Sequence, residues 1–208
     1  LDADADNVHA DPRNGHIVVG YGSGGLAILD VASRTVLSRI SLSAHPEGFQ
    51  VDPNTGRAIV NVPDSHAIDS VDLGSGTVTS WGLPAQLFNF PLALDPNGPR
   101  VASVFRLPAR VVLFDGATGS VIASEPTCGD SDDAFFDARR HRLYVACGEG
   151  VVDVFNVAGE AFGRIARVHT AAGARTALFV PELDRLFVAA RAPQTGHNGA
   201  ILVFRPEP

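Results

Sequence analysis

Residues 48–62 read GFQVDPNTGRAIVNV, two apolar runs on either side of the turn segment DPNTG. Short runs of β-branched and aromatic residues, bounded by Gly, Pro, Asn and Asp, are typical of strands joined in a hairpin. Two further runs follow, Ala67 to Asp72 and Thr77 to Trp81, separated by Gly74-Ser75-Gly76. The stretch therefore predicts four short antiparallel strands, which together make one small sheet.

The same pattern recurs along the whole chain. An anchor at the first turn of each copy recurs at intervals of 41, 43, 42 and 43 residues, at Asp11, Asp52, Asp95, Asp137 and Val180. In the first four copies a second anchor lies nineteen or twenty residues after the first, at Asp30, Asp72, Asp115 and Asn156. Four strands per copy at such a period predict the blades of a β-propeller. Because one small sheet cannot bury both of its faces alone, neighbouring blades should pack face to face.

We therefore expect an all-β protein that forms one β-propeller domain over residues 1–208. The repeats span approximately 5–45, 46–88, 89–130, 131–173 and 174–208. This gives five blades of a four-stranded repeat, and the fifth blade ends after its third strand. Strand hairpins are expected at Asp11-Pro12, Asp52-Pro53, Asp95-Pro96 and Arg139-Arg140.

The segments that lead into the innermost strand of each blade carry a family resemblance. These lead-in segments include HPEGFQ (45–50), FNFP (88–91), GDSDD (129–133) and GARTALFVPEL (173–183). They resemble the YVTN-type repeats of the YncE-like bacterial propeller proteins, over essentially the whole chain. The resemblance implies an exported, periplasmic or secreted propeller, usually of seven blades and often without an assigned activity. Compared with seven blades this chain lacks N-terminal ones, and both a fragment and a natural five-bladed variant fit its length.

Composition excludes some classes of partner. The net charge of −7 and the pI near 5.4 argue against nucleic acid, because proteins that bind the phosphate backbone concentrate positive charge. No apolar run approaches the length that a membrane span requires. The expected partner is a small polar ligand or a protein.

One sequence motif imitates a cofactor site. Residues 20–25 read GYGSGG and match GxGxxG, but the dinucleotide fingerprint requires a helix after the glycines. Leu26-Ala27-Ile28-Leu29 follows instead and predicts a strand, so we interpret the motif as a hairpin turn. The GxSxG and HExxH signatures of common hydrolases and zinc proteases are absent from the sequence.

The candidate site comes from aligning the lead-in segments. Residues at the same offset in successive blades should ring one mouth of the propeller channel. Positions five and four residues before the anchors include several charged or polar side chains. His45 and Asn89 lie just upstream of these positions in the second and third blades. The predicted ligand-binding set is Asp6, Asn7, His45, Glu47, Asn89, Asp132, Asp133 and Arg175.

Three interpretations of this set stay open. Its members line a wet channel, or some of them hold a divalent metal, or they bind a polar ligand. Glu47 and Asp132 are the candidate metal ligands, for calcium, magnesium or zinc. Arg175 argues against a simple metal cage and suits a carboxylate or phosphate. We favour a binding module; the alternative is a metal-dependent propeller enzyme of the lactonase or lyase kind. No catalytic residue can be named.

The two cysteines are predicted to form a disulfide. Cys128 lies in the segment that leads into blade four, and Cys147 ends the second strand of the same blade. Antiparallel pairing brings both to one rim of the sheet. An exported protein permits such a bond.

Overall fold

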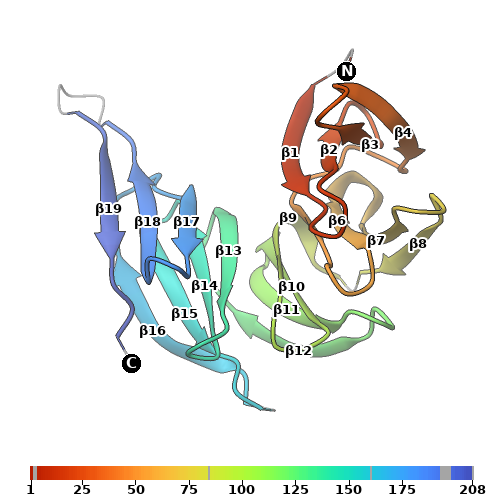
Figure 1. Cartoon of the computed structure of the whole chain (residues 1–208). Helices are drawn as coiled ribbons and strands as arrows, with labels where there is room; N and C mark the ends of the chain where they lie inside the picture. The colour runs from red at the N-terminus through yellow and green to blue at the C-terminus, as the bar shows by residue number, and fades with distance from the viewer. Residues whose placement is uncertain (2–3, 84, 160, 193–197, 208) are drawn as a thin grey trace. The chain divides into compact units, whose positions relative to one another are not determined.

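The structure, a computed structural model, describes residues 1, 4–83, 85–159, 161–192 and 198–207. It consists of antiparallel sheets, and the 3-10 turn Pro63–Ser65 is the only helical element in the described part of the chain. The sheets follow one another along the sequence as five propeller blades (Figure 1). The all-β propeller prediction is confirmed. None of the described helical segments has the length and apolar character that crossing a membrane requires.

Each sheet is a meander of sequential strands. The first has the order β1-β2-β3-β4, the second β5-β6-β7-β8, the third β12-β11-β10-β9, the fourth β13-β14-β15-β16, and the fifth, with three strands, β17-β18-β19. The bounds are β1 Ala5–Ala10, β2 Ile17–Tyr21, β3 Gly25–Asp30, β4 Thr35–Ser41, β5 Phe49–Val51, β6 Arg57–Val62, β7 Ala67–Asp72, β8 Val78–Gly82, β9 Leu87–Leu94, β10 Arg100–Leu107, β11 Ala109–Asp115, β12 Val121–Pro126, β13 Ser131–Asp137, β14 Arg142–Cys147, β15 Val151–Asn156, β16 Gly163–His169, β17 Ala177–Val180, β18 Arg185–Ala190 and β19 Ala200–Phe204.

The chain divides into two compact units, Leu1–Leu92 and Ala93–Pro208, and the boundary falls inside β9. The first unit contains the first two sheets, and the second contains the fourth, the fifth and most of the third. That residues 1–208 form a single domain stays a prediction.

The anchor aspartates have a structural explanation. In the first turn of a blade the carboxylate accepts the amide N–H two residues later, at 2.8 Å from Asn54 to Asp52 and 2.9 Å from Asn97 to Asp95. Aspartate stabilises turns in this way. The turn after Asp52 closes at Gly56, whose φ of +70° favours glycine. The hairpins predicted at the four first-turn positions are present between β1 and β2, β5 and β6, β9 and β10, and β13 and β14.

The cores lie between successive sheets. In the first unit, side chains such as Leu26 from the first sheet pack with Phe49 and Val60 from the second. In the second unit, Leu143 and Val145 of β14 pack against the third sheet, whereas the alternate residues of β14 pack against the fifth. Side chains alternate across a strand, so both faces of β14 are buried. This two-sided burial explains why the inner strands are continuous apolar runs.

The GxGxxG motif forms a hairpin turn, as predicted. Its residues connect β2 to β3, and no helix follows them. Gly24 has a φ of +155°, and a Cβ there would lie 2.7 Å from the carbonyl oxygen of Leu42. The glycine is therefore required by close backbone packing and not by a cofactor.

Candidate functional site

Three residues of the predicted set come together in the first unit. Asp6 lies on β1, and His45 and Glu47 lie on the segment between β4 and β5. One ligand atom of each lies within 4.8 Å of the others, and the Nε2 atom of His45 is 3.9 Å from Oδ2 of Asp6. The side chains of His45 and Asp6 are 29% and 50% exposed, so the group is open to solvent. We call Asp6, His45 and Glu47 the first cluster.

Local backbone bonds hold the first cluster in place. The carbonyl of Gly22, in the β2–β3 turn, lies 2.5 Å from Nδ1 of His45, and the amide of the same glycine donates to the carbonyl of Asp4 at 2.7 Å. The turn therefore ties the histidine ring to the start of β1. The Glu47 amide donates to the Asn61 carbonyl at 2.9 Å, which fixes the backbone of the second acid.

Asn89 is held inside the first unit and makes structural hydrogen bonds. Its side chain is buried, and its Nδ2 donates to Oδ1 of Asn61 and to the carbonyl of Ala67, both at 3.0 Å. Asn61 in turn donates to the carbonyl of Phe90 at 3.0 Å. These bonds join the second sheet to β9. Asn7 lies next to Asp6 on β1 and is half-buried.

A second group of charged residues forms in the second unit. Arg175 lies 2.7 Å from Asp130 and 3.3 Å from Asp132, and Arg106 lies 2.7 Å from Asp132 and 3.6 Å from Asp130. We call Arg106, Asp130, Asp132 and Arg175 the second cluster. The carboxylate of Asp130 raises the pKa of the Arg175 guanidinium. Two acids and two arginines neutralise one another here.

Asp133 is engaged differently from its neighbour Asp132. Its Oδ2 accepts the amide N–H of Ala177 at 2.7 Å, which links β13 to β17. Burial, with a smaller effect of the nearby charge of Asp132, raises the pKa of Asp133 to about 6 despite the lowering effect of the Ala177 amide. Asp133 is therefore a carboxyl group that changes charge near neutral pH.

The lead-in strands share a backbone irregularity at the predicted site positions. The register of β1 against β2 shifts between Ala5 and Val8, and that of β13 against β14 shifts between Ser131 and Asp133. Asp6 and Asp132 lie inside these shifts. Irregularities of this kind redirect side chains and are frequent beside functional sites. The two aspartates, at the same offset from their anchors, thus occupy similar backbone positions in blades one and four.

Sequence reasoning missed two residues of the second cluster. Asp130 was visible as the first of three acids in GDSDD, but its offset fell outside the aligned positions. Arg106 is the penultimate residue of β10 and lies outside the lead-in segments, and only the fold brings it to Asp132. The convergence of all eight predicted residues on one channel mouth stays a prediction, because they are divided between the two units.

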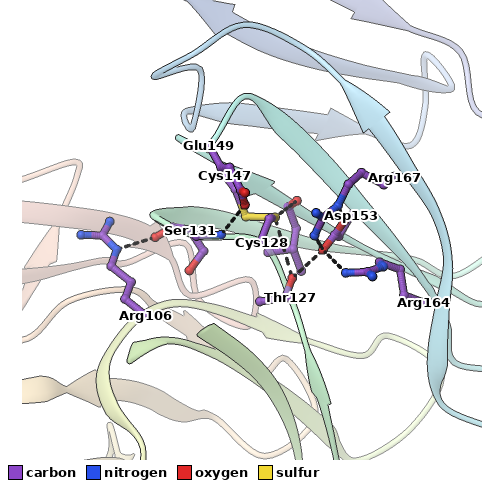
Figure 2. Close-up of a disulfide and its surroundings, with 11 residues drawn as sticks. Arg106, Thr127, Cys128, Ser131, Cys147, Glu149, Asp153, Arg164 and Arg167 are labelled. Carbon is purple, nitrogen blue, oxygen red and sulfur yellow. Dashed lines mark hydrogen bonds and ion pairs between the residues drawn. A yellow bond between two sulfur atoms is a disulfide. The ribbon is translucent and has the colours of Figure 1, made fainter. Parts of the chain in front are cut away.

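The disulfide forms between Cys128 and Cys147, with an S–S distance of 2.00 Å, and both residues are buried (Figure 2). Beside it lies Asp153, which is fully buried and accepts bonds from Arg167 at 2.7 and 2.9 Å and from Arg164 at 3.1 Å. Burial raises the pKa of Asp153, but the hydrogen bonds and charges of the two arginines outweigh it and lower the pKa overall. This network is a structural ion cluster within the fourth sheet.

The second unit also contains a cavity of about 460 Å³. It is lined by residues of the fourth and fifth sheets, among them Tyr144, Val154, Ile165, Leu186 and Phe204. None of the predicted site residues lines it. The cavity is mainly apolar and is distinct from the lead-in segments.

The five sheets and their repeat define the class of protein: this is a β-propeller protein with charged lead-in segments. No protein-family model matches the chain, and no curated protein matches it.

Proposed function

We propose that this chain is an extracytoplasmic propeller of the YVTN type that acts as a binding module. Its ligand is a small polar molecule or a polar group of a protein, bound at the lead-in segments. The observation that carries the proposal is the first cluster, where two carboxylates and an imidazole gather within 4.8 Å at a solvent-accessible place. Polar groups gathered on a rigid sheet framework are typical of binding sites.

The second cluster supports the same proposal in a different way. Its arginines are paired with aspartates, so an incoming anionic ligand has to compete with Asp130 and Asp132 for them. A ligand that carries both a carboxylate and hydroxyl or amine groups can replace such bonds, because its carboxylate accepts from the arginines and its hydroxyl or amine groups donate to the aspartates. Sugar acids and amino acids have this chemistry.

The disulfide supports the extracytoplasmic location. Structural disulfides persist in oxidising compartments and are rare in the cytosol of mesophiles. The bond between Cys128 and Cys147 is buried in the core between the third and fourth sheets, as expected of a structural bond. The proposed location, periplasmic or secreted, agrees with the family resemblance.

A panel of sugars, sugar acids and amino acids tests the binding proposal by thermal shift, followed by calorimetric titration. We expect at least one compound to stabilise the protein, because a ligand that binds only the folded state raises the melting temperature. The stabilisation should be lost in Glu47→Gln or Arg175→Gln. Arg39→Gln, on the exposed strand β4, is the matched control and should keep it. Binding that persists in both site variants would contradict the proposal.

One observation favours the alternative function, a metal-dependent enzyme of the lactonase or lyase kind. The first cluster has the mixed nitrogen and oxygen donors that a catalytic cation uses. Assay of metal-loaded protein against simple lactones decides between the two functions. Hydrolysis that depends on Glu47 would favour the enzyme.

A further inference from the structure

We infer that the first cluster is a binding site for one divalent transition-metal ion, with zinc as its best-suited occupant. Asp6 supplies one carboxylate oxygen, His45 its Nε2 atom and Glu47 a second carboxylate oxygen. This inference deepens the proposed function and rests on it, because the ion becomes part of what the lead-in segments bind. It also narrows the choice among calcium, magnesium and zinc.

The state of the histidine ring is the first argument. Nδ1 of His45 lies 2.5 Å from the carbonyl oxygen of Gly22, and a carbonyl oxygen can only accept a hydrogen bond. Nδ1 therefore carries a hydrogen, which leaves Nε2 as the ring atom that can offer a lone pair to a metal ion. That atom is the one that faces Asp6, at 3.9 Å from Oδ2. Metal-binding histidines are oriented in this way, by donating their other N–H to a carbonyl or carboxylate.

The spacing of the donors is the second argument. Two donors bound to the same zinc ion at about 2.1 Å lie roughly 3.4 Å apart in a tetrahedral site. The separation of 3.9 Å between His45 and Asp6 needs to shorten by only about 0.5 Å. Asp6 is half-exposed and has room to make this movement. All three donor atoms lie within 4.8 Å of one another, so small rotations of the side chains can bring them to the distances of a zinc site.

The sequence explains why His45 and Glu47 act together. They flank Pro46, which fixes φ and disfavours helical backbone at the residue before it. The two residues lie in the short segment between β4 and β5, and their donor atoms lie within 4.8 Å of each other. Pro46 itself packs toward the first sheet, where its Cγ lies 3.1 Å from the position of a Cβ on Gly20. The proline ring is therefore turned toward Gly20, and the residues on either side of it both gather with Asp6.

The donor set selects the ion. Calcium and magnesium prefer sites made entirely of oxygen, whereas zinc accepts imidazole nitrogen together with carboxylate oxygen. Two carboxylates and one neutral imidazole give the site a charge of −2, which balances a divalent cation. Three protein ligands leave a fourth position of zinc for water or for a polar group of a ligand. This open position would connect the ion to the proposed binding function.

The test uses the whole chain, stripped with EDTA, dialysed and titrated with zinc chloride by calorimetry. We expect one equivalent to bind, and Asp6→Asn, His45→Gln and Glu47→Gln each to weaken binding at least tenfold. His169→Gln, which removes an exposed histidine of β16, is the matched control and should bind as the parent does. Circular dichroism and the urea midpoint of each apo variant check that it is folded. Cobalt in place of zinc should give visible d–d absorption that His45→Gln abolishes.

The inference is overturned by absence of zinc binding, by binding that all three variants retain, or by binding that His169→Gln reduces as much as His45→Gln does. Preference for calcium over zinc also overturns it, because His45 would then not be a ligand. The proposed function is tested separately with the panel of polar compounds in metal-free buffer. Loss of compound binding in Arg175→Gln, without any zinc binding, would refute the metal site and leave the binding module standing.

Discussion

Reduction of the disulfide between Cys128 and Cys147 should destabilise the second unit by about 3 kcal/mol. The bond closes a loop whose ends are 19 residues apart in the sequence. Closing a loop of about 20 residues removes chain entropy from the unfolded state worth about 3 kcal/mol at 25 °C. With a urea dependence of about 2 kcal/mol per molar, the midpoint of unfolding should fall by about 1.5 M.

The assay compares oxidised and reduced protein by urea titration, followed by circular dichroism. Both sulfurs are buried, so reduction is carried out in denaturant before refolding, and two thiols are counted with a chromogenic reagent. The Cys128→Ser, Cys147→Ser double variant is the control, whose midpoint the reductant should leave unchanged. Trp81 is the sole tryptophan and lies in the first unit, so its fluorescence follows the unit without the disulfide. A reduced protein with two free thiols and an unchanged midpoint would refute the loop-entropy argument.

Three further predictions concern buried charges. Asp153→Asn should lower the free energy of unfolding by about 2–4 kcal/mol, because it removes charge-assisted hydrogen bonds from two arginines. Asp69→Asn, at the corresponding place in the second sheet, should leave the free energy of unfolding at pH 7 unchanged or raise it. Burial raises the pKa of Asp69, and one of its oxygens lacks a hydrogen-bond partner among the described residues. Urea titrations giving the reverse order would contradict this. Asp133 has a folded-state pKa of about 6, above the unfolded value of about 4. The free energy of unfolding should therefore be highest below about pH 4 and fall by about 3 kcal/mol as the pH rises through 6, because the buried carboxyl group then loses its proton. Asp133→Asn should flatten that fall in midpoints measured from pH 4 to 8, and an unchanged slope would count against it. Arg140→Met should lower the free energy of unfolding by about 3 kcal/mol, because Arg140 is nearly buried between two carboxylates, one of them Asp184. A urea midpoint equal to that of the parent would refute this stabilising role.

The blades were predictable because local chemistry determines their turns. An aspartate that accepts the amide two residues later stabilises the same turn in each of the first four blades, so these anchors recur at a steady period. Apolar runs between those turns are then long enough for one strand each. Burial of both faces, as in β14, makes these runs continuous and easy to find in the sequence.

The candidate site was less predictable, because offsets in a sequence do not determine the partners of side chains. Asp132 and Asp133 are adjacent, yet one pairs with arginines and the other accepts a backbone amide from the next strand. The register shift between Ser131 and Asp133 gives the side chains of Asp132 and Asp133 different directions. No residue type in the sequence predicts such a shift. Arg106 reaches the site only through tertiary contacts, since it comes from a different sheet.

The two clusters also predict where a cation would not bind. The sequence treated Glu47 and Asp132 as equivalent candidate ligands, but Asp132 lies within hydrogen-bond distance of a guanidinium at 2.7 Å. A metal ion at Asp132 would have to displace that arginine and leave its charge beside another cation, which is costly. The first cluster supplies a histidine nitrogen where the second supplies arginines. Asp132→Asn should therefore leave the zinc titration unchanged, whereas Asp6→Asn should weaken zinc binding at least tenfold. Equal losses in the two variants would show that the assignment of the zinc site to the first cluster alone is wrong.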